Sequence, residues 1–407
     1  ATGQTLFPGT AIRDFGPVQV GIIGMTLEDT ATLVSPAGVA GLTFRDEADT
    51  ANAAVPALKA AGADAIVLLI HEGARTKGGY NDKSCPELSG DILPIIERLD
   101  PAIDLVVSGH THAAYICELP RSNARPLLLT SAGRYGTLIT DIRLAFGPDR
   151  TLQGHRADNV IVQGEGYTFG NNIVAPVPAY PIYAADPATK ALVDRYVAAA
   201  APEAARVIGR LDGTATRALS DDREQTAGNL VADSQLAFAR KAGAQFALMN
   251  PGGVRADLAP NAAGEVTYGQ AFAMQPFGNN VVVKTLTGAQ VKALLEQQFA
   301  SGSNTAEAPM VFLPSHNFFF AYDLSRPAGQ RIVEMKLDGK PIAPGATYRL
   351  AVNNFLASGG DNFTVLNDGT GTVDVGLDLD ALEAWLKAGA KVPELGRIDN
   401  RTPVPAG

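Results

Sequence analysis

The sequence predicts two successive domains, an α/β domain with a layered sheet followed by an α+β domain. The chain has 407 residues, more than one hydrophobic core usually accommodates. In its first third, short apolar runs alternate with amphipathic stretches. After a proline-rich segment, strand-like and helix-like stretches follow one another without strict alternation, which is typical of an α+β domain.

Three nearly continuous apolar runs define the first domain. They lie at Val18–Met25, Ala65–Ile70 and Asp104–Gly109, and such runs are typical of strands buried on both faces. The amphipathic stretches Glu47–Ala61 and Asp91–Leu99 predict helices that cover the sheet. We therefore expect a layered β-sandwich flanked by helices, with ligands bound beyond the carboxyl ends of the strands.

The composition changes after Phe146. A proline-rich stretch runs from Pro176 to Pro187, and an alanine-rich segment at Ala188–Ala200 predicts a helix with a solvated face. We interpret this helix as an interdomain connector, and the alternative is that it is the last helix of the first domain. The predicted division is residues 1–175, a linker and helix over 176–204, and the second domain over 205–407.

The second domain is predicted to mix helices with strands. The expected helices are Gly228–Ala242, Thr287–Phe299 and Asp380–Lys387. The expected strands are Phe246–Met249, Val281–Thr287, Arg331–Leu337 and Tyr348–Val352.

Composition excludes two classes of partner. A formal net charge of -9 argues against a binder of DNA or RNA polymers, because such a protein needs a basic face to displace phosphate counterions. We find no run of about 18 apolar residues that could span a bilayer. A small phosphorylated ligand stays compatible with this charge, since a few local cations suffice to bind it.

Three of the five histidines follow predicted strands. His71 directly follows the apolar residues of LLIHEG, while His110 and His112 lie in VVSGHTHA. Extended residues two apart point the same way, so His110 and His112 are expected to aim their imidazoles into one site. Taken alone, His71 is a strand-end hydrogen-bonding residue; taken together, the three predict a metal site. His155 and His316 lack such a context and are expected to be structural or surface residues.

The second domain offers a different set of side chains. Gly252 and Gly253 precede Arg255, whose guanidinium can hold a phosphate or carboxylate in a bidentate manner. Phe277 and Phe355 lie in loops rich in Gly and Asn, where two facing rings could clamp a planar base. The alternatives are that both rings pack inward and that Arg255 forms a structural ion pair. Asp233 is expected to be a solvated or capping carboxylate.

The histidine motifs resemble the last two metal-binding motifs of the calcineurin-like metallophosphoesterases. This resemblance implies two divalent metal ions, zinc by preference, with manganese, cobalt or magnesium as alternatives. It assigns His71 and His110 to one metal and His112 to the other. The family's D-x-H, bridging Asp and GN-H-E/D motifs do not occur before His71. We therefore expect a domain lacking its N-terminal part, weak single-metal binding, no certain catalytic residue, and a separate N-terminal fragment as a partner.

The second domain resembles the C-terminal domain of the 5′-nucleotidase family. The resemblance rests on REQTAGNLVADS from Arg223, NPGGVRADL from Asn250, MQPFGNN from Met274 and NNFLASGGDNF from Asn353. It implies two aromatic walls around a nucleobase, amides at the base edge, a carboxylate on the ribose hydroxyls and a cation on the phosphate. The residues so implied are Arg223, Asn250, Gly253, Arg255, Phe277, Asn279, Asn354, Phe355 and Asp361.

The resemblance implies a dinuclear-metal hydrolase that converts nucleoside monophosphates to nucleosides and phosphate. Within this class, a UDP-sugar or 2′,3′-cyclic nucleotide hydrolase is the alternative. From a different class comes a nucleotide-binding chain without catalysis. Cys85 and Cys117 follow the two histidine motifs and are expected to form a disulfide, with two unrelated buried thiols as the alternative. A disulfide favours a periplasmic or secreted protein.

Overall fold

The computed structural model describes residues 5, 7–34, 36–121, 124–169 and 172–403. It divides into two compact units. Unit 1 comprises Ala1–Ala31, Val39–Tyr167 and Ile173–Ala185, and unit 2 comprises Thr32–Gly38, Thr168–Asn172 and Asp186–Gly407. Among the described residues, no helix is long and apolar enough to cross a membrane.

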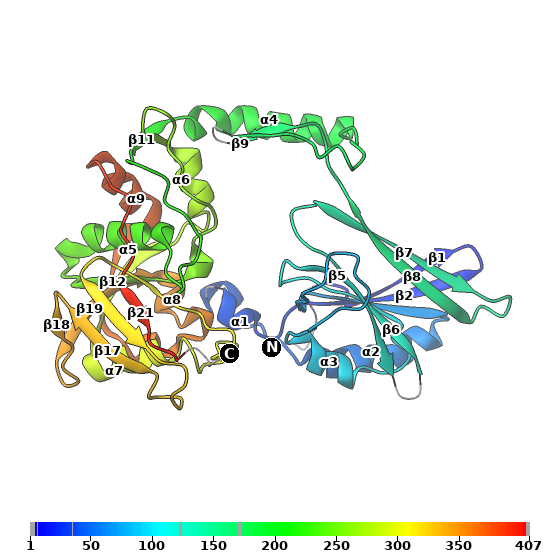
Figure 1. The fold of residues 1–407 in the computed structure, drawn as a ribbon. Coiled ribbons are helices and arrows are strands. Elements are labelled where there is room, and N and C mark those ends of the chain that lie inside the picture. Colours follow the sequence, from blue (N-terminus) through cyan, green and yellow to red (C-terminus); the bar gives the residue numbers. More distant parts are fainter. Residues whose placement is uncertain (1–4, 6, 35, 122–123, 170–171, 404–407) are drawn as a thin grey trace. The chain divides into compact units, whose positions relative to one another are not determined.

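Unit 1 is built on a six-stranded sheet in the order β1-β2-β3-β4-β6-β5 (Figure 1). Strands β2, β3, β4 and β6 are parallel, and the two outer strands, β1 and β5, are antiparallel to their neighbours. The parallel core explains why these strands have apolar sequences. The bounds are β1 Thr10–Phe15, β2 Val18–Met25, β3 Ala65–Ile70, β4 Leu105–Val107, β5 Ala114–Arg121 and β6 Ala124–Ala132.

One face of this sheet is covered by helices α2 (Glu47–Ala60) and α3 (Ile92–Arg98), as predicted (Figure 1). The Asp46 side chain caps α2 by accepting a hydrogen bond from the Asp49 amide. Apolar residues of both helices form one core with inward residues of β2, β3 and β4, among them Ile66 and Leu68. The helices therefore bury only one side of the sheet.

The other face is covered in part by an antiparallel ribbon of β7 (Leu138–Phe146) and β8 (Leu152–Ile161). A cavity of about 480 Å³ lies between apolar side chains of β1, β2, β3 and β7. On the same side of β3, Leu69 is 42% exposed. The expectation of strands buried on both faces holds on this side for Leu105 and Leu128 but not for Leu69, because local apolar runs do not reveal how far a distant ribbon extends.

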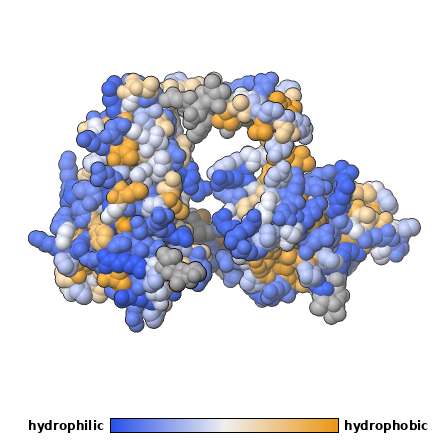
Figure 2. Space-filling view, in the orientation of Figure 1, coloured by the Kyte–Doolittle hydropathy of each residue, from blue (hydrophilic) through white to orange (hydrophobic). Residues whose placement is uncertain are grey.

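The described elements outside the main sheets and their covering helices are short, apart from one long helix. The short elements are α1 (Thr30–Leu33), η1 (Pro36–Val39), β9 (Tyr167–Phe169) and β10 (Asn172–Val174). Helix α4 (Pro187–Ala204) begins after its cap Asp186 and has no buried residue. Figure 2 shows hydrophobic surface on it, consistent with the exposed side chains of Leu192 and Tyr196.

Over its described residues 186–403, unit 2 contains three sheets. The five-stranded sheet has the order β15 (Leu313–Pro314), β12 (Phe246–Met249), β19 (Thr347–Asn353), β14 (Asn280–Thr287) and β20 (Thr370–Leu377). The four-stranded sheet has the order β18 (Lys340–Pro341), β17 (Ile332–Leu337), β16 (Phe318–Tyr322) and β21 (Ile398–Asn400). The third pairs β11 (Val207–Arg210) with β13 (Glu265–Thr267).

Two hydrophobic cores lie on the two faces of the five-stranded sheet. One packs the sheet against α5 (Thr226–Ala239) and α9 (Asp378–Lys387), and the other includes α7 (Gly288–Glu296) and β16. The remaining helical elements are α6 (Tyr268–Met274), α8 (Asn354–Ala357), η2 (Arg240–Ala242), η3 (Pro251–Gly253), η4 (Gly360–Asn362) and η5 (Thr364–Asp368). The mixed α/β fold class expected from the sequence is confirmed.

Asp233 on α5 differs from its prediction. It is 5% exposed and forms an ion pair with Arg397 over 2.8 Å, while the amide and ring of His316 also approach its carboxylate. A buried carboxylate needs such partners. The expectation of a solvated side chain is wrong, because Arg397 is 164 residues away in sequence.

Candidate functional site

The three histidines lie at one edge of the unit 1 sheet. His71 follows β3 directly, and the segment with His110 and His112 follows β4. Because β3 and β4 are adjacent and parallel, their carboxyl ends meet at the same edge. The structure thus brings the two histidine segments together, as predicted from the strand-end motifs.

Two glycines allow these segments to approach each other. The Gly109 amide donates a hydrogen bond of 3.1 Å to the Glu72 carbonyl. A Cβ atom at Gly73 would lie 2.1 Å from the Gly109 carbonyl oxygen, so any side chain there would force the segments apart. The backbone contact therefore requires glycine at position 73.

The ring arrangement differs from the expected one. The centroids of His71 and His110 lie 5.3 Å apart in an edge-to-face geometry, whereas His112 lies 5.8 Å from the Tyr135 ring. His110 and His112 both have left-handed backbones, with φ of 61° and 59°. The expectation of an extended HxH pair is wrong here, because a bend follows β4 and removes the strand alternation.

Charge at this edge is set by burial and crowding. Desolvation lowers the pKa of His110, and the neighbouring rings of His71 and His112 lower it further. Burial raises the pKa of Glu72 to about 7, and the surrounding carboxylates act in the same direction. The Glu72 carboxylate accepts a hydrogen bond of 2.7 Å from the Gly73 amide. At neutral pH, the lowered pKa of His110 favours its neutral imidazole, which is the form that binds metals.

The donor set does not complete a metal centre. A structural zinc site has four protein ligands, and a catalytic site has three plus a water. Among the described residues, no three His, Cys, Asp or Glu side chains come together in a way that could hold a metal ion. His71 and His110 supply two adjacent imidazoles, so the described residues at this edge do not complete a dinuclear centre by themselves.

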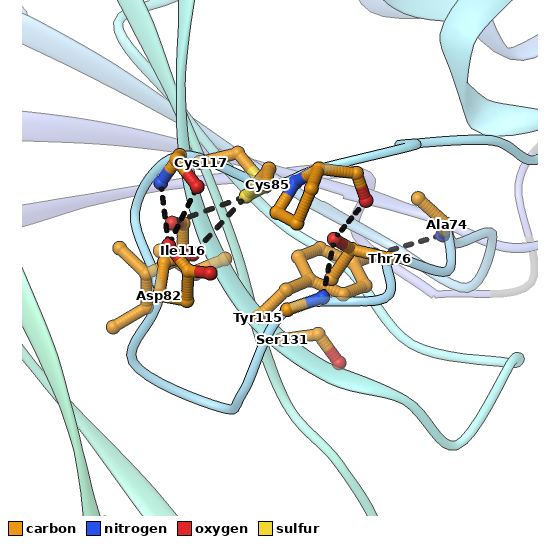
Figure 3. The surroundings of a disulfide bond; sticks show 12 residues. Ala74, Thr76, Asp82, Cys85, Tyr115, Ile116, Cys117 and Ser131 are labelled. Carbon is orange, nitrogen blue, oxygen red and sulfur yellow. Dashed lines mark hydrogen bonds between the residues drawn. A yellow bond between two sulfur atoms is a disulfide. The ribbon is translucent and has the colours of Figure 1, made fainter.

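A disulfide joins Cys85 to Cys117 beside this edge (Figure 3). Cys85 lies in the loop that follows His71, and Cys117 lies on β5, which follows His112. In the same surroundings, the Tyr115 hydroxyl accepts a hydrogen bond of 2.9 Å from the Ala74 amide. The predicted pairing is present, and it ties together the two chain segments that carry the histidines.

A second strand-end cluster lies in unit 2. Strands β12 and β19 are parallel, so the residues that end them, Asn250 and Asn353, lie at one edge. The Asn353 side-chain amide donates to Asn250 Oδ1 over 3.0 Å. The Asn250 amide donates in turn to Asp361 Oδ2 over 2.7 Å. Three polar side chains from distant parts of the chain thus form one connected network.

Asp361 is held in an unusual backbone conformation. It has φ of 53°, and Asn362 after it has φ of 63°. The Asp361 carbonyl accepts a hydrogen bond of 2.8 Å from the Asn304 amide, and Ser301 donates to the Asn362 carbonyl. Burial raises the pKa of Asp361, while the bond from Asn250 lowers it. Left-handed residues held this firmly are common at binding sites.

Aromatic and cationic groups lie in the neighbouring loops. The guanidinium of Arg255 lies 5.7 Å from the centre of the Phe277 ring, and Phe277 is 54% exposed. Phe355 is half-buried, and a Cβ at Gly360 would lie 2.5 Å from its ring, so Gly360 gives the ring room. Phe277 does not pack inward, and the Arg255 guanidinium donates to the Gly252 carbonyl over 3.3 Å.

Of the other predicted residues, three lie near the Asn250 network or its neighbouring loops, and Arg223 lies elsewhere. Asn279 precedes β14, whose first amide, from Asn280, donates to Asn354 Oδ1 over 3.0 Å. Gly253 ends η3 next to Asn250. Arg223 lies by Tyr322 on β16, where its charge lowers the pKa of a phenol whose pKa burial raises to about 12. The structure shows no contact that places Arg223 in the Asn250 network among the described residues.

Sequence reasoning missed two residues of this cluster. Asn353 stood out only as the first residue of a motif, although it links Asn250 to the end of β19. Arg217 is exposed and its guanidinium donates to the backbone carbonyl of Arg255 over 3.2 Å, which places a second cation beside the Arg255 main chain. The buried asparagine at a strand end was a usable signal, whereas nothing near Arg217 in sequence distinguishes it from a surface arginine.

Comparisons with known proteins agree with this geometry. Residues 207–368 match the family model for the 5′-nucleotidase C-terminal domain. This stretch is therefore a 5′-nucleotidase C-terminal domain, and the chain is similar to 5′-nucleotidases over most of its length. A solved 5′-nucleotidase precursor from Thermus thermophilus is 29% identical with a TM-score of 0.76, covering 96% of this chain and 74% of that one.

Curated relatives extend the match beyond unit 2. The 5′-nucleotidase of Vibrio cholerae is 24% identical, over 96% of this chain and 70% of the relative. Endonuclease YhcR of Bacillus subtilis is 28% identical over 88% of this chain. The chain spans only 26% of the length of YhcR, and 23% and 44% of the next two relatives.

Proposed function

We propose that this chain binds a nucleoside 5′-monophosphate in unit 2. The observation that carries the proposal is the network of Asn353, Asn250 and Asp361 at a strand-end edge, with Arg255 and Phe277 in an adjoining loop. A connected set of amides and a carboxylate, next to an exposed aromatic ring and a guanidinium, matches the parts of a nucleotide.

Each part of a nucleotide has a matching group. Phe277 and Phe355 would stack on the base, and Asn279 and Asn354 would meet its edge. Asp361, oriented by Asn250, would accept hydrogen bonds from the ribose hydroxyls. Arg255, assisted by Arg217, would hold the phosphate. Gly253 leaves room for this loop, because a Cβ there would lie 2.4 Å from the Met249 side chain.

We further propose that nucleotide phosphoester hydrolysis, with two divalent metal ions, belongs to this protein when further ligands are supplied. Zinc is the preferred ion, with manganese, cobalt and magnesium as alternatives. The adjacent imidazoles of His71 and His110 support a share in metal binding. A further polypeptide segment would supply the other ligands, and the partly covered sheet face of unit 1 offers it an apolar surface.

Two alternatives remain distinct proposals. Without the further ligands, the chain would bind nucleotides and not hydrolyse them, which is consistent with the incomplete donor set. A UDP-sugar or a 2′,3′-cyclic nucleotide would be an alternative substrate, since each carries a base that can stack on the aromatic rings. A periplasmic or secreted location is supported by the Cys85–Cys117 disulfide, because such bonds persist in oxidising compartments.

Titration calorimetry and phosphate release on the same preparation test these proposals. We expect AMP to bind more tightly than adenosine, because only AMP offers a phosphate to Arg255. We expect no release of phosphate from AMP with zinc or manganese beyond that of a His112→Asn variant. Turnover clearly above that variant would reject the binding-only alternative, and no binding of AMP or adenosine at millimolar concentration would reject nucleotide recognition.

A further inference from the structure

Lys284 on β14 is a buried lysine outside the nucleotide cluster. The residue is 8% exposed, and its neighbour Gly369 leaves space for its stem, since a Cβ there would lie 3.0 Å from Lys284 Cδ. Lysine is rarely buried unless its ammonium is paired. The position of its charge therefore needs an explanation.

The ammonium group is bound by main-chain oxygens. Lys284 Nζ donates to the carbonyl of Ala357 over 2.7 Å and to that of Leu366 over 2.6 Å. Ala357 ends α8, and Leu366 lies in η5. The loop between these two carbonyls contains Asp361, and Phe355 lies just before it.

These contacts favour a role in shaping the loop over a role in the core. Burial lowers the pKa of Lys284, so placing an ammonium here has a cost that an apolar side chain would avoid. Asp368 attracts the charge, but both hydrogen bonds go to the loop backbone. The two bonds fix the distance between the ends of the loop, and with it the placement of Phe355 and Asp361.

We propose that Lys284 is a positioning residue for nucleoside recognition, a cation that closes the 357–366 loop and so sets the base-stacking ring and the ribose-binding carboxylate in register. The proposal rests on the nucleotide binding proposed above. It assigns no contact between Lys284 and the ligand. Recognition of phosphate by Arg255 lies on a different loop and does not depend on Lys284.

The test compares Lys284→Met, which keeps an apolar stem in the core, with Lys340→Met at an exposed position on β18. Titration calorimetry with adenosine and with inorganic phosphate measures the two halves of recognition. We expect Lys284→Met to weaken adenosine binding by about 10- to 100-fold, as for loss of hydrogen bonds from a charged group. Phosphate binding and the Lys340→Met control should stay unchanged.

Hydrogen exchange of the ligand-free protein gives an independent readout. In Lys284→Met, amides of residues 354–369 should exchange faster than in the wild type, while those of 275–279 keep their protection. Equal loss of adenosine and phosphate affinity, or an unchanged exchange pattern in 354–369, would overturn the proposal. If the wild type binds no adenosine, the proposed function fails, and the exchange pattern still decides whether Lys284 closes the loop.

Discussion

The histidine edge of unit 1 and the asparagine edge of unit 2 arise in the same way, but they differ in how many side-chain contacts they hold. Both lie where parallel strands end side by side, β3 with β4 and β12 with β19. In unit 2, the Asn250, Asn353 and Asp361 side chains already bind one another. In unit 1, two imidazoles lie edge to face, and the described residues provide no third metal ligand beside them.

This difference shows what a strand-end edge does and does not supply. The edge brings side chains from distant segments together, but a working site also needs partners that fix each side chain. Asn250 has two such partners, whereas the ring of His110 faces another ring and the backbone contact is made by its neighbour Gly109. The unit 2 site should therefore tolerate isolation better than the unit 1 site.

Removing the disulfide should produce the largest effect and confine it to unit 1. Replacing Cys85 and Cys117 by alanine opens a loop with a sequence separation of 32 residues. We expect unit 1 to lose about 3 to 4 kcal/mol of unfolding free energy. Far-UV circular dichroism in urea would follow both units, while the single tryptophan, Trp385 on α9, reports unit 2 alone, so a shift seen only by circular dichroism belongs to unit 1. A matching shift of the tryptophan transition would show that the two units do not unfold independently.

The next largest effect is expected from pH, which should change the stability of unit 2 through Asp378. Burial raises the pKa of Asp378 to about 6, so its folded state binds a proton more tightly than its unfolded state. Its contribution is present below about pH 4 and is lost as pH rises through about 6, a span of about 2 to 3 kcal/mol. Urea unfolding of unit 2, followed by Trp385 fluorescence at pH 5 and pH 7, should show this dependence flattened in Asp378→Asn. An identical slope in the variant would mean that another group titrates.

Loss of the Arg255 guanidinium should weaken the binding of AMP and not that of adenosine. Arg255→Ala should weaken AMP binding by about 2 kcal/mol and leave adenosine binding nearly unchanged, because the guanidinium is proposed to meet only the phosphate. Arg223→Ala is the matched control, since Arg223 lies by Tyr322. Calorimetry with both ligands measures this. An equal effect of the two substitutions on AMP binding would place Arg223 in the site after all.

The smallest effect is expected at the histidine edge. His110→Asn keeps a residue type that tolerates the left-handed backbone, so unfolding free energy should change by less than about 0.5 kcal/mol. The weak stabilisation of unit 1 by zinc should disappear, and AMP binding should not change. Thermal scans with and without zinc measure both. Zinc stabilisation that survives in the variant would exclude His110 as a ligand.

The sequence predicts what short-range patterns encode. Val18–Met25 and Ala65–Ile70 form strands with the predicted bounds, and the strand-end positions of His71 and Asn250 follow from them. Contacts between distant segments were not predictable in this way. The ion pair of Asp233 with Arg397 depends on residues that only the folded chain brings together. The same holds for the partly covered face of the unit 1 sheet, because the ribbon of β7 and β8 that covers it lies downstream in the sequence.

The backbone contact at Gly73 also bears on how this edge can change over evolution. Any side chain at position 73 clashes with the Gly109 carbonyl, so a single substitution there pushes the two histidine segments apart. No second change nearby restores the contact, because the obstacle is main chain. Histidines 71 and 110 can be exchanged for other residues one at a time, whereas the glycine that sets their spacing cannot. A deep mutational scan should therefore find position 73 less tolerant than either histidine.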